Sequence, residues 1–394
     1  MKPIPDGIKS FLSKGFNLPL IQKSRLQWVD YLRGIAIILI VYSHVLFGLR
    51  KKSDAIGPMP EILTQINMIF FSFRMPLFFI LSGVFISRSL AKKSVKELVG
   101  VKFEKLLYPY LIWAFIQVSL QIIFSPVTNA NRSLIDYTYI FYQTRSLDQF
   151  WYLPALFNTT IIYLLIKTKL KVNTGVQMTI GLVLYFISPY FQAVSMISDW
   201  MAFYFFFALG DAFSTIFFQE RSQKFFKSWI SLLLIIPIFI LTQRYSLNHG
   251  LNNIAIADKP DHFRHIMDQL DFLFNALIGC LAMFIVAFYL QKLNILRFLR
   301  VLGYHSLYIY VMHVIITAAV RLSMIHALGI TNPVVLLFCS VFVGITVPII
   351  FYNYLVKDGP LWFLFSYKAK KKETASVAEA RVTAASPLPE SKVL

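Results

Sequence analysis

Long apolar stretches separated by short polar segments run along almost the whole chain. A helix needs about 20 mostly apolar residues to cross a bilayer. Ten stretches reach or approach that length, near residues 30–49, 66–87, 106–124, 150–166, 176–194, 197–218, 229–243, 269–290, 303–325 and 332–356. A barrel of strands would instead show short segments in which apolar and polar residues alternate. The pattern therefore predicts an all-α, polytopic membrane protein with about ten transmembrane helices.

The composition supports the same class. Hydrophobic residues make up 57% of the chain and charged residues 14%, whereas soluble domains have roughly 45–50% and about 25%. The two cysteines, Cys280 and Cys339, stand in apolar stretches, where we interpret them as packing residues. A soluble globular fold is therefore excluded.

The distribution of charge predicts the orientation in the membrane. The chain carries 38 Lys and Arg residues against 19 Asp and Glu, a formal net charge of +19. Such an excess often indicates nucleic-acid binding, but here the basic residues gather in alternate loops. They lie before residue 28 and within 88–105, 167–171, 221–227, 292–300 and 357–372. Because cytoplasmic loops collect Lys and Arg, both termini are predicted to be cytoplasmic. Arg50–Lys51–Lys52 is the exception to this pattern, since it is a basic run on the predicted outer side. The charge thus reflects topology, and no nucleic-acid partner is expected.

Three regions follow from this topology. Residues 1–28 are predicted to form a cytoplasmic or interfacial segment, and residues 29–356 a ten-span membrane domain. Residues 357–394 are predicted to form a cytoplasmic, disordered tail, because Ala, Ser, Lys, Glu and Pro dominate its sequence.

Two ionisable residues stand in the first span, where a charge at membrane depth is expensive. His44 follows Arg33 by eleven positions, an offset that is about 20° beyond three full helical turns and a rise of about 16 Å. The two side chains therefore share one face of one helix, and Asp30 can neutralise Arg33 locally. Arg33 alone is compatible with a side chain that snorkels to the interface, and His44 alone with packing between helices. Their shared face favours a functional pair.

Later spans add a few more polar groups. Arg74 stands in the outer half of the second span, which continues into Ser82 and Gly83, a pair that allows close helix approach. His313 lies near the middle of the ninth span, where a second buried imidazole can meet the first. The loop 244–268 holds several His and Asp residues but too few converging ligands for a metal site, so no metal is expected.

In this combination the chain resembles the acyltransferase-3 family of integral-membrane acyltransferases. The resemblance covers about residues 1–356 and rests on four strings that stand in the family's order. They are Asp30-Tyr31-Leu32-Arg33-Gly34-Ile35-Ala36 with His44 following, Met75-Pro76-Leu77-Phe78-Phe79-Ile80-Leu81-Ser82-Gly83, Phe150-Trp151-Tyr152-Leu153, and Gly303 to His313 through Ser306-Leu307-Tyr308. The resemblance implies a multi-pass protein of a bacterial plasma (inner) membrane that transfers acetyl groups from acetyl-CoA to hydroxyls of surface polysaccharides.

Three positions depart from the family pattern. Lys102 and Lys105 stand where the family usually has arginines before the third span, and a lysine holds phosphate as a point charge without bidentate geometry. Arg74 stands where many relatives have histidine. The basic pair keeps its charge, so the hypothesis retains a phosphate-binding role for it.

The resemblance leads to a hypothesis for the donor end and the reacting centre. Arg33, Lys102 and Lys105 would bind the phosphates of acetyl-CoA at the cytoplasmic mouth. The pantetheine arm would run along the first helix to His44, which would act as general base or, as a variant, form an acetyl-imidazole intermediate. Asp30 would orient the cationic end.

The remaining residues receive roles around this centre. Arg74 and His313 would support the oxyanion or orient the catalytic histidine, and Ser82 with Gly83 would allow close helix packing. Trp151 and Tyr152, at the outer mouth of the fourth span, would bind the sugar, although aromatic residues are common at membrane interfaces. The expected partners are acyl-CoA, a glycan or lipid-linked saccharide acceptor and the lipid bilayer, and a homo-oligomer is left open.

Two other classes remain open at this stage. A transporter or flippase for a sugar or lipid-linked sugar also uses charged residues along its path, whereas a non-enzymatic scaffold would not need two histidines near the midplane. We prefer the acyltransferase because the four strings match its family. An acyltransferase consumes acetyl-CoA in detergent without a gradient, and a carrier does not.

Overall fold

The structure is a computed structural model that describes residues 14–16, 26–52, 56–125, 132–249 and 266–368. Within these ranges every element is helical. The elements are α3 (Gln27–Arg50), α5 (Glu61–Ile69), α6 (Phe71–Val84), α7 (Ile86–Leu90), α8 (Val95–Lys102), η1 (Phe103–Leu107), α9 (Tyr108–Ile123), η2 (Leu134–Thr138), α10 (Tyr139–Tyr142), η3 (Thr144–Trp151), α11 (Tyr152–Thr168), α12 (Thr174–Ile187), η4 (Ser188–Val194), α13 (Ser195–Ala212), α14 (Ser214–Phe218), α15 (Glu220–Phe226), α16 (Trp229–Asn248), α18 (Ile266–Leu293), α19 (Phe298–Tyr304), α20 (Ser306–Leu322), η6 (Ser323–Ala327), α21 (Pro333–Phe351), η7 (Tyr352–Val356) and η8 (Trp362–Leu364).

The described part of the chain contains 9 helical stretches that are long and apolar enough to cross a membrane. One of them, Thr174–Ala212, has 39 residues, which as a straight helix would reach about twice the thickness of the bilayer core. The 3₁₀ turn η4 divides this stretch, and α12 and α13 pack against each other on either side of it. We therefore count two passes here, and the predicted all-α, polytopic membrane fold is confirmed.

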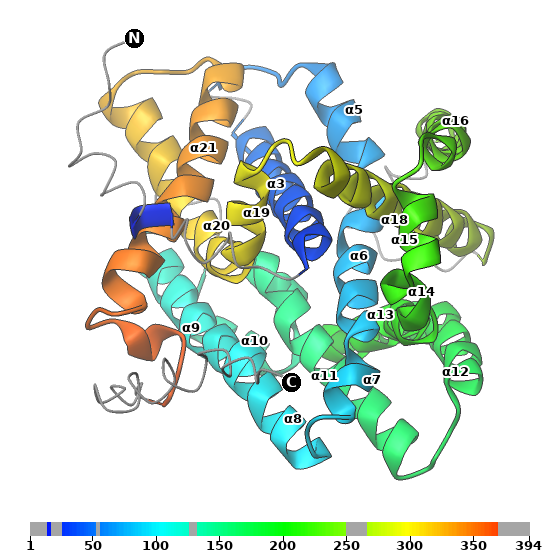
Figure 1. Ribbon diagram of the computed structural model, residues 1–394. Coiled ribbons are helices and arrows are strands. Elements are labelled where there is room, and N and C mark those ends of the chain that lie inside the picture. Colours follow the sequence, from blue (N-terminus) through cyan, green and yellow to red (C-terminus); the bar gives the residue numbers. More distant parts are fainter. Residues whose placement is uncertain (1–13, 17–25, 53–55, 126–131, 250–265, 369–394) are drawn as a thin grey trace, which may run out of the picture.

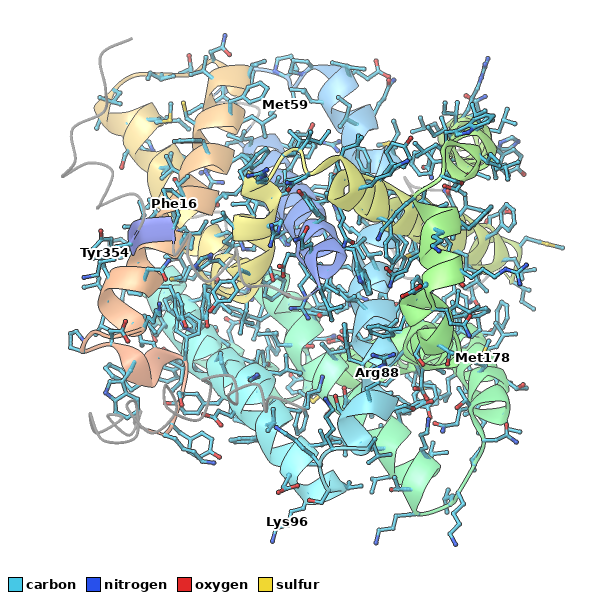
Figure 2. The ribbon with its side chains drawn as sticks, viewed as in Figure 1. Phe16, Met59, Arg88, Lys96, Met178 and Tyr354 are labelled. Carbon is cyan, nitrogen blue, oxygen red and sulfur yellow. The ribbon has the colours of Figure 1, made fainter. Side chains whose placement is uncertain are left out.

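The two ends of the described chain lie together. The Asn353 side chain donates a hydrogen bond to the Gly15 carbonyl at 2.7 Å, and the Lys14 ammonium lies 5.3 Å from the centre of the Tyr354 ring. Figure 2 labels Phe16 and Tyr354 at this contact. Because both ends lie on one side of the bundle, the number of passes is even, in agreement with ten.

The terminal segments are described only in part. Residues 1–13, 17–25 and 369–394, which hold most of the predicted interfacial segment and tail, lie outside the described residues. Residues 357–368 include η8, and Leu364 and Phe365 are buried against the helices. This first part of the tail is therefore packed, and the prediction of disorder from residue 357 is wrong there.

α3 lies at the centre of the bundle, with α19 beside it and α16 at one edge (Figure 1). Two glycines let α3 and α19 approach until their backbones touch. A Cβ on Gly34 would collide with the Leu299 carbonyl, and a Cβ on Gly303 would collide with the Asp30 carbonyl. The contact holds α19 against the inner end of α3, beside the turn that carries Arg33.

A buried carboxylate joins three helices at the predicted cytoplasmic side. Asp211, near the end of α13, accepts hydrogen bonds from the Ser87 hydroxyl at 2.5 Å and the Tyr163 phenol at 2.6 Å. It also forms an ion pair with Lys167 of α11. These contacts fasten α7, α11 and α13 to one another near the ends of α11 and α13.

Candidate active site

The centre of the candidate site is a pair of imidazoles on α3 and α20. The ring centres of His44 and His313 lie 5.1 Å apart at an interplanar angle of 62°. The Nδ1 of His313 lies 2.8 Å from the Tyr310 carbonyl and 3.1 Å from the Ile309 carbonyl. Because carbonyls only accept, Nδ1 carries the hydrogen and Nε2 is the acceptor in the neutral ring. That Nε2 is buried and has no hydrogen-bond partner among the residues that the structure describes.

Arg74 of α6 provides a cation beside this pair. Its guanidinium donates to the side-chain Oδ1 of Asn67 at 3.1 Å and lies 4.6 Å from the centre of the Phe71 ring. The residue is 9% exposed, and it is close enough to His44 for their charges to interact. The guanidinium is therefore held in place near the imidazoles at the outer half of the membrane domain.

Arg33 lies at the other end of the same face of α3. Its charge interacts with Asp30, with Lys102 at the end of α8, and with Tyr152 at the start of α11. Lys105 follows one turn later and is exposed, but its charge still acts on Lys102. The structure thus gathers three predicted phosphate-binding cations at the predicted cytoplasmic side.

Lys102 directly precedes the π-helix η1 (Phe103–Leu107), and Lys105 belongs to it. A π-helix widens the backbone by one residue per turn and is frequent at functional sites. No pattern in the sequence marks it. Its position between α8 and α9 sets the direction in which both lysine side chains leave the backbone.

The second span carries the predicted close approach of helices. A Cβ on Gly83 would collide with the Phe207 carbonyl of α13, and a Cβ on Gly210 would collide with the Ile80 carbonyl of α6. The neighbouring hydroxyl of Ser82 lies within hydrogen-bonding reach of the Tyr152 phenol. Ser82 and Gly83 therefore fix α6 against α13 and α11, as helix-packing residues do.

Tyr152 lies deeper than the sequence predicted. It is buried, its ring centre lies 5.5 Å from that of Tyr310, and the Tyr310 ring lies 6.1 Å from that of His313. Tyr152 thus connects the Arg33 end of the site with the imidazole pair, and its placement at the outer mouth is wrong. Adjacent residues of a helix differ in direction by about 100°, so its neighbour points elsewhere.

Trp151 is partly buried and lies within a polar cluster. The Arg145 guanidinium lies 4.5 Å from the centre of the Trp151 ring and donates to Asp199 at 2.5 Å. Asp199 is fully buried, whereas the Arg145 side chain is 53% exposed. Sequence reasoning missed Asp199 and Asp211, although each is an ionisable residue inside an apolar run, which is the signal that would have found them.

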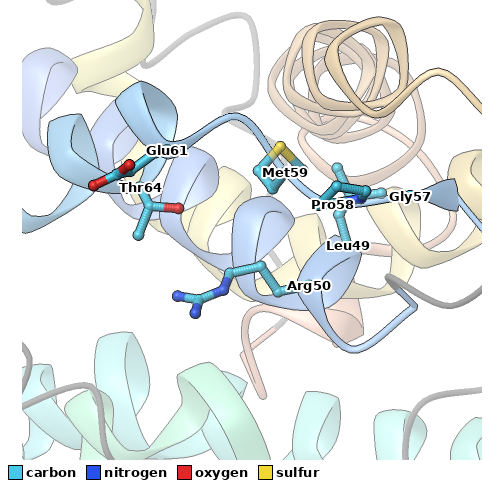
Figure 3. Close-up of a pocket in the computed structure, with 7 residues that line it drawn as sticks. All are labelled: Leu49, Arg50, Gly57, Pro58, Met59, Glu61 and Thr64. Carbon is cyan, nitrogen blue, oxygen red and sulfur yellow. The ribbon is translucent and has the colours of Figure 1, made fainter.

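A cavity of about 420 Å³ lies at the outer end of α3 (Figure 3). Its lining comes from the end of α3 and the start of α5 and consists of Leu49, Arg50, Gly57, Pro58, Met59, Glu61 and Thr64. Arg50 belongs to the basic run that the charge pattern assigned to the outer side. The cavity therefore lies beyond His44, at the opposite end of the helix from Arg33.

The sequence predicts no metal site. Among them, no group of three or more His, Cys, Asp or Glu side chains is arranged to hold a metal ion. Residues 250–265, which hold most of the His- and Asp-bearing loop, lie outside the described residues.

Comparison with known proteins adds the following findings. A sequence profile described as an acyltransferase domain (Acyl_transf_3) matches residues 26–353. The nodulation protein NolL of Mesorhizobium japonicum (strain LMG 29417) is similar, with 29% identity over 140 residues, which are 35% of this chain and 35% of that protein. The match thus spans about a third of that relative's length. No solved structure matches this chain.

Proposed function

This chain belongs to the acyltransferase-3 family and is a multi-pass membrane acyltransferase, and we propose that it moves an acyl group from cytoplasmic acyl-CoA to a glycan. The acyl group is acetyl, and the acceptor is a hydroxyl of a cell-surface or lipid-linked polysaccharide. The membrane is the bacterial plasma (inner) membrane. The observation that carries the proposal is the single face of α3 with Arg33 at its inner end and the His44–His313 pair further out.

The inner end supports binding of the donor. Phosphate groups need cations, and Arg33, Lys102 and Lys105 gather there from two separate helical segments. Arg33 adds the bidentate geometry that lysine lacks. The rise from Arg33 to His44, about 16 Å, matches an extended pantetheine arm. With the nucleotide held at the inner mouth, the thioester reaches the imidazole pair.

The imidazole pair supports base catalysis. The acceptor Nε2 of His313 can take a hydrogen bond from one nitrogen of His44, which leaves the other His44 nitrogen as a base. His44 removes the proton of the acceptor hydroxyl while the hydroxyl oxygen attacks the thioester carbonyl carbon. The oxyanion then collapses, the carbon–sulfur bond breaks, and His44 returns the proton to the thiolate. An ester and free CoA thiol result.

The outer cavity supports entry of the acceptor from the opposite side. Arg50, Glu61 and Thr64 line it, and their side chains offer donors and acceptors for sugar hydroxyls. Trp151 with Arg145 pairs an aromatic ring with a cation, a combination that suits binding of a sugar at the predicted outer mouth. Donor and acceptor thus approach His44 from opposite ends of α3.

The test uses purified protein in detergent, without a membrane gradient. Acetyl-CoA labelled in the acetyl group is supplied together with envelope polysaccharide extracted from cells that lack the gene. We expect label to appear on the polysaccharide with wild-type protein, and Arg33→Ala to raise the KM for acetyl-CoA. A wild-type protein that neither consumes acetyl-CoA nor labels the polysaccharide would favour a carrier and overturn the proposal.

A further inference from the structure

Asn67 is the buried residue of α5, a helix that otherwise exposes its apolar side chains. It is 1% exposed, whereas Ile62 is 59% and Ile66 36% exposed on the same helix. In a membrane protein the apolar face meets lipid, and a polar residue that turns inward at membrane depth marks a functional position. Asn67 therefore points into the protein, and its hydrogen bond to Arg74 places it beside α6. Its helix also packs against α3, which carries His44, and against α16.

The orientation of the Asn67 amide follows from its partner. The Arg74 Nη1 lies 3.1 Å from the atom assigned as Oδ1 of Asn67. A guanidinium only donates hydrogen bonds, so the atom facing it is the oxygen and the amide is not flipped. The Nδ2 group is then the donor that remains, and it is buried with no hydrogen-bond partner anywhere in the ranges described above. A buried donor without a partner costs about 1–3 kcal/mol, so a ligand that accepts from it recovers that energy.

We propose that the Asn67 amide N–H and the Arg74 guanidinium together bind the oxyanion that forms during acyl transfer. The inference rests on the proposed function and adds a catalytic residue to it. The oxyanion appears when the acceptor oxygen bonds to the thioester carbonyl carbon and disappears when the carbon–sulfur bond breaks. A neutral N–H donor beside a fixed cation stabilises that charge in a site shielded from water.

A role limited to positioning makes a different prediction. If Asn67 only holds Arg74 in place, its oxygen is the functional atom and the N–H is irrelevant. Asn67→Asp separates the two roles, because aspartate has the same shape and keeps an oxygen for Arg74 but has no N–H donor. Because the carboxylate also adds a negative charge beside Arg74, the Asn67→Asp result is read together with that of Asn67→Ala, which removes the donor without adding a charge. Asn67→Ala removes both groups, and Gln65→Ala is the matched control, since Gln65 lies on the same helix, is exposed and donates a hydrogen bond to Glu61 at 3.0 Å.

The experiment measures kcat and KM for labelled acetyl-CoA, with polysaccharide from cells lacking the gene as acceptor, and acetyl-CoA binding by calorimetry. We expect Asn67→Asp and Asn67→Ala to lower kcat by about 100-fold or more, the usual loss for one oxyanion donor. Binding of acetyl-CoA should stay unchanged, because Arg33, which binds the donor phosphates, lies at the far end of α3. Unchanged binding also shows that each variant is folded. Gln65→Ala keeps wild-type kinetics.

Each outcome is decisive. A near-wild-type kcat for Asn67→Asp overturns the inference and leaves Asn67 as a positioning residue. A near-wild-type kcat for Asn67→Ala excludes both roles. If Asn67→Asp does not bind acetyl-CoA, a near-wild-type kcat for Asn67→Ala still overturns the inference, and a kcat lowered by about 100-fold supports a role of Asn67 in the transition state. Failure of the proposed function is recognised separately, because then wild type and Gln65→Ala also transfer nothing.

Discussion

Replacing Gly303 or Gly34 by alanine should loosen the contact between α3 and α19. The new methyl group would lie well inside 3.0 Å of a main-chain carbonyl of the other helix, that of Asp30 for Gly303 and that of Leu299 for Gly34. A helical carbonyl has no rotamer to change, so the helices must move apart. Since Arg33 lies on the turn that is displaced, donor binding should weaken together with stability.

Two opposing terms set the size of the effect. Alanine favours a helix over glycine by about 0.5–1 kcal/mol, whereas overpacking a close contact costs about 1–3 kcal/mol. Gly100 in α8 isolates the first term, because a Cβ there meets no described atom within 4 Å. Gly100→Ala should therefore raise the free energy of unfolding. Gly303→Ala should have a free energy of unfolding lower than that of Gly100→Ala by the cost of overpacking, about 1–3 kcal/mol.

The assay is thermal unfolding of the purified variants in one detergent, followed by circular dichroism, with the KM for acetyl-CoA measured in parallel. The expected order of melting temperatures is Gly100→Ala, then wild type, then Gly303→Ala and Gly34→Ala. The two destabilised variants should also show a raised KM. If Gly303→Ala melts as high as Gly100→Ala, the helices have room to spare and the reasoning about their contact is refuted.

Three further predictions concern single residues. In the same melting assay, Lys167→Met should lower the free energy of unfolding by about 2–4 kcal/mol and Asp211→Asn by about 1 kcal/mol. The losses differ because the Asp211 side chain is 1% exposed and would keep an unpaired charge, whereas the Lys167 side chain is 22% exposed. Equal losses for the two variants would contradict this reasoning. Lys102→Ala should raise the KM for acetyl-CoA about tenfold and the exposed Lys105→Ala less than about threefold, and steady-state kinetics with the reverse order would refute the assignment. Trp151→Ala should raise the KM for the polysaccharide several-fold and leave that for acetyl-CoA unchanged, so a change in the latter alone would exclude an acceptor role.

Much of the fold follows from simple periodicity. The apolar stretches predict the long helices because the bilayer sets their length, and the spacing of Arg33 and His44 on one helix predicts their shared face. The depth of His44 and His313 in their spans predicts that the two imidazoles can meet, and in the structure their ring centres lie 5.1 Å apart. Such properties depend on the position of a residue along one helix and on its depth in the bilayer, and both can be read from the spacing of residues in the sequence.

The rest depends on how helices turn relative to one another. The predicted span 66–87 placed Asn67 at its very end, whereas the structure extends the helix back to Glu61 and breaks it at Phe70, which turns Asn67 inward. Trp151 and Tyr152 are neighbours in sequence, but at the junction of η3 and α11 Tyr152 is buried in the core whereas Trp151 is only partly buried. Rotation of a helix about its axis comes from packing partners distant in sequence, which a single sequence does not reveal.

The central claim is that acyl transfer takes place at His44. Its most direct test is mass spectrometry of the surface polysaccharide from cells that lack the gene and carry either the wild-type chain or His44→Ala, at equal amounts of protein in the membrane. The account predicts ester-linked acetyl groups with the wild-type chain and none with His44→Ala. Polysaccharide that is acetylated to the same extent by His44→Ala would contradict it.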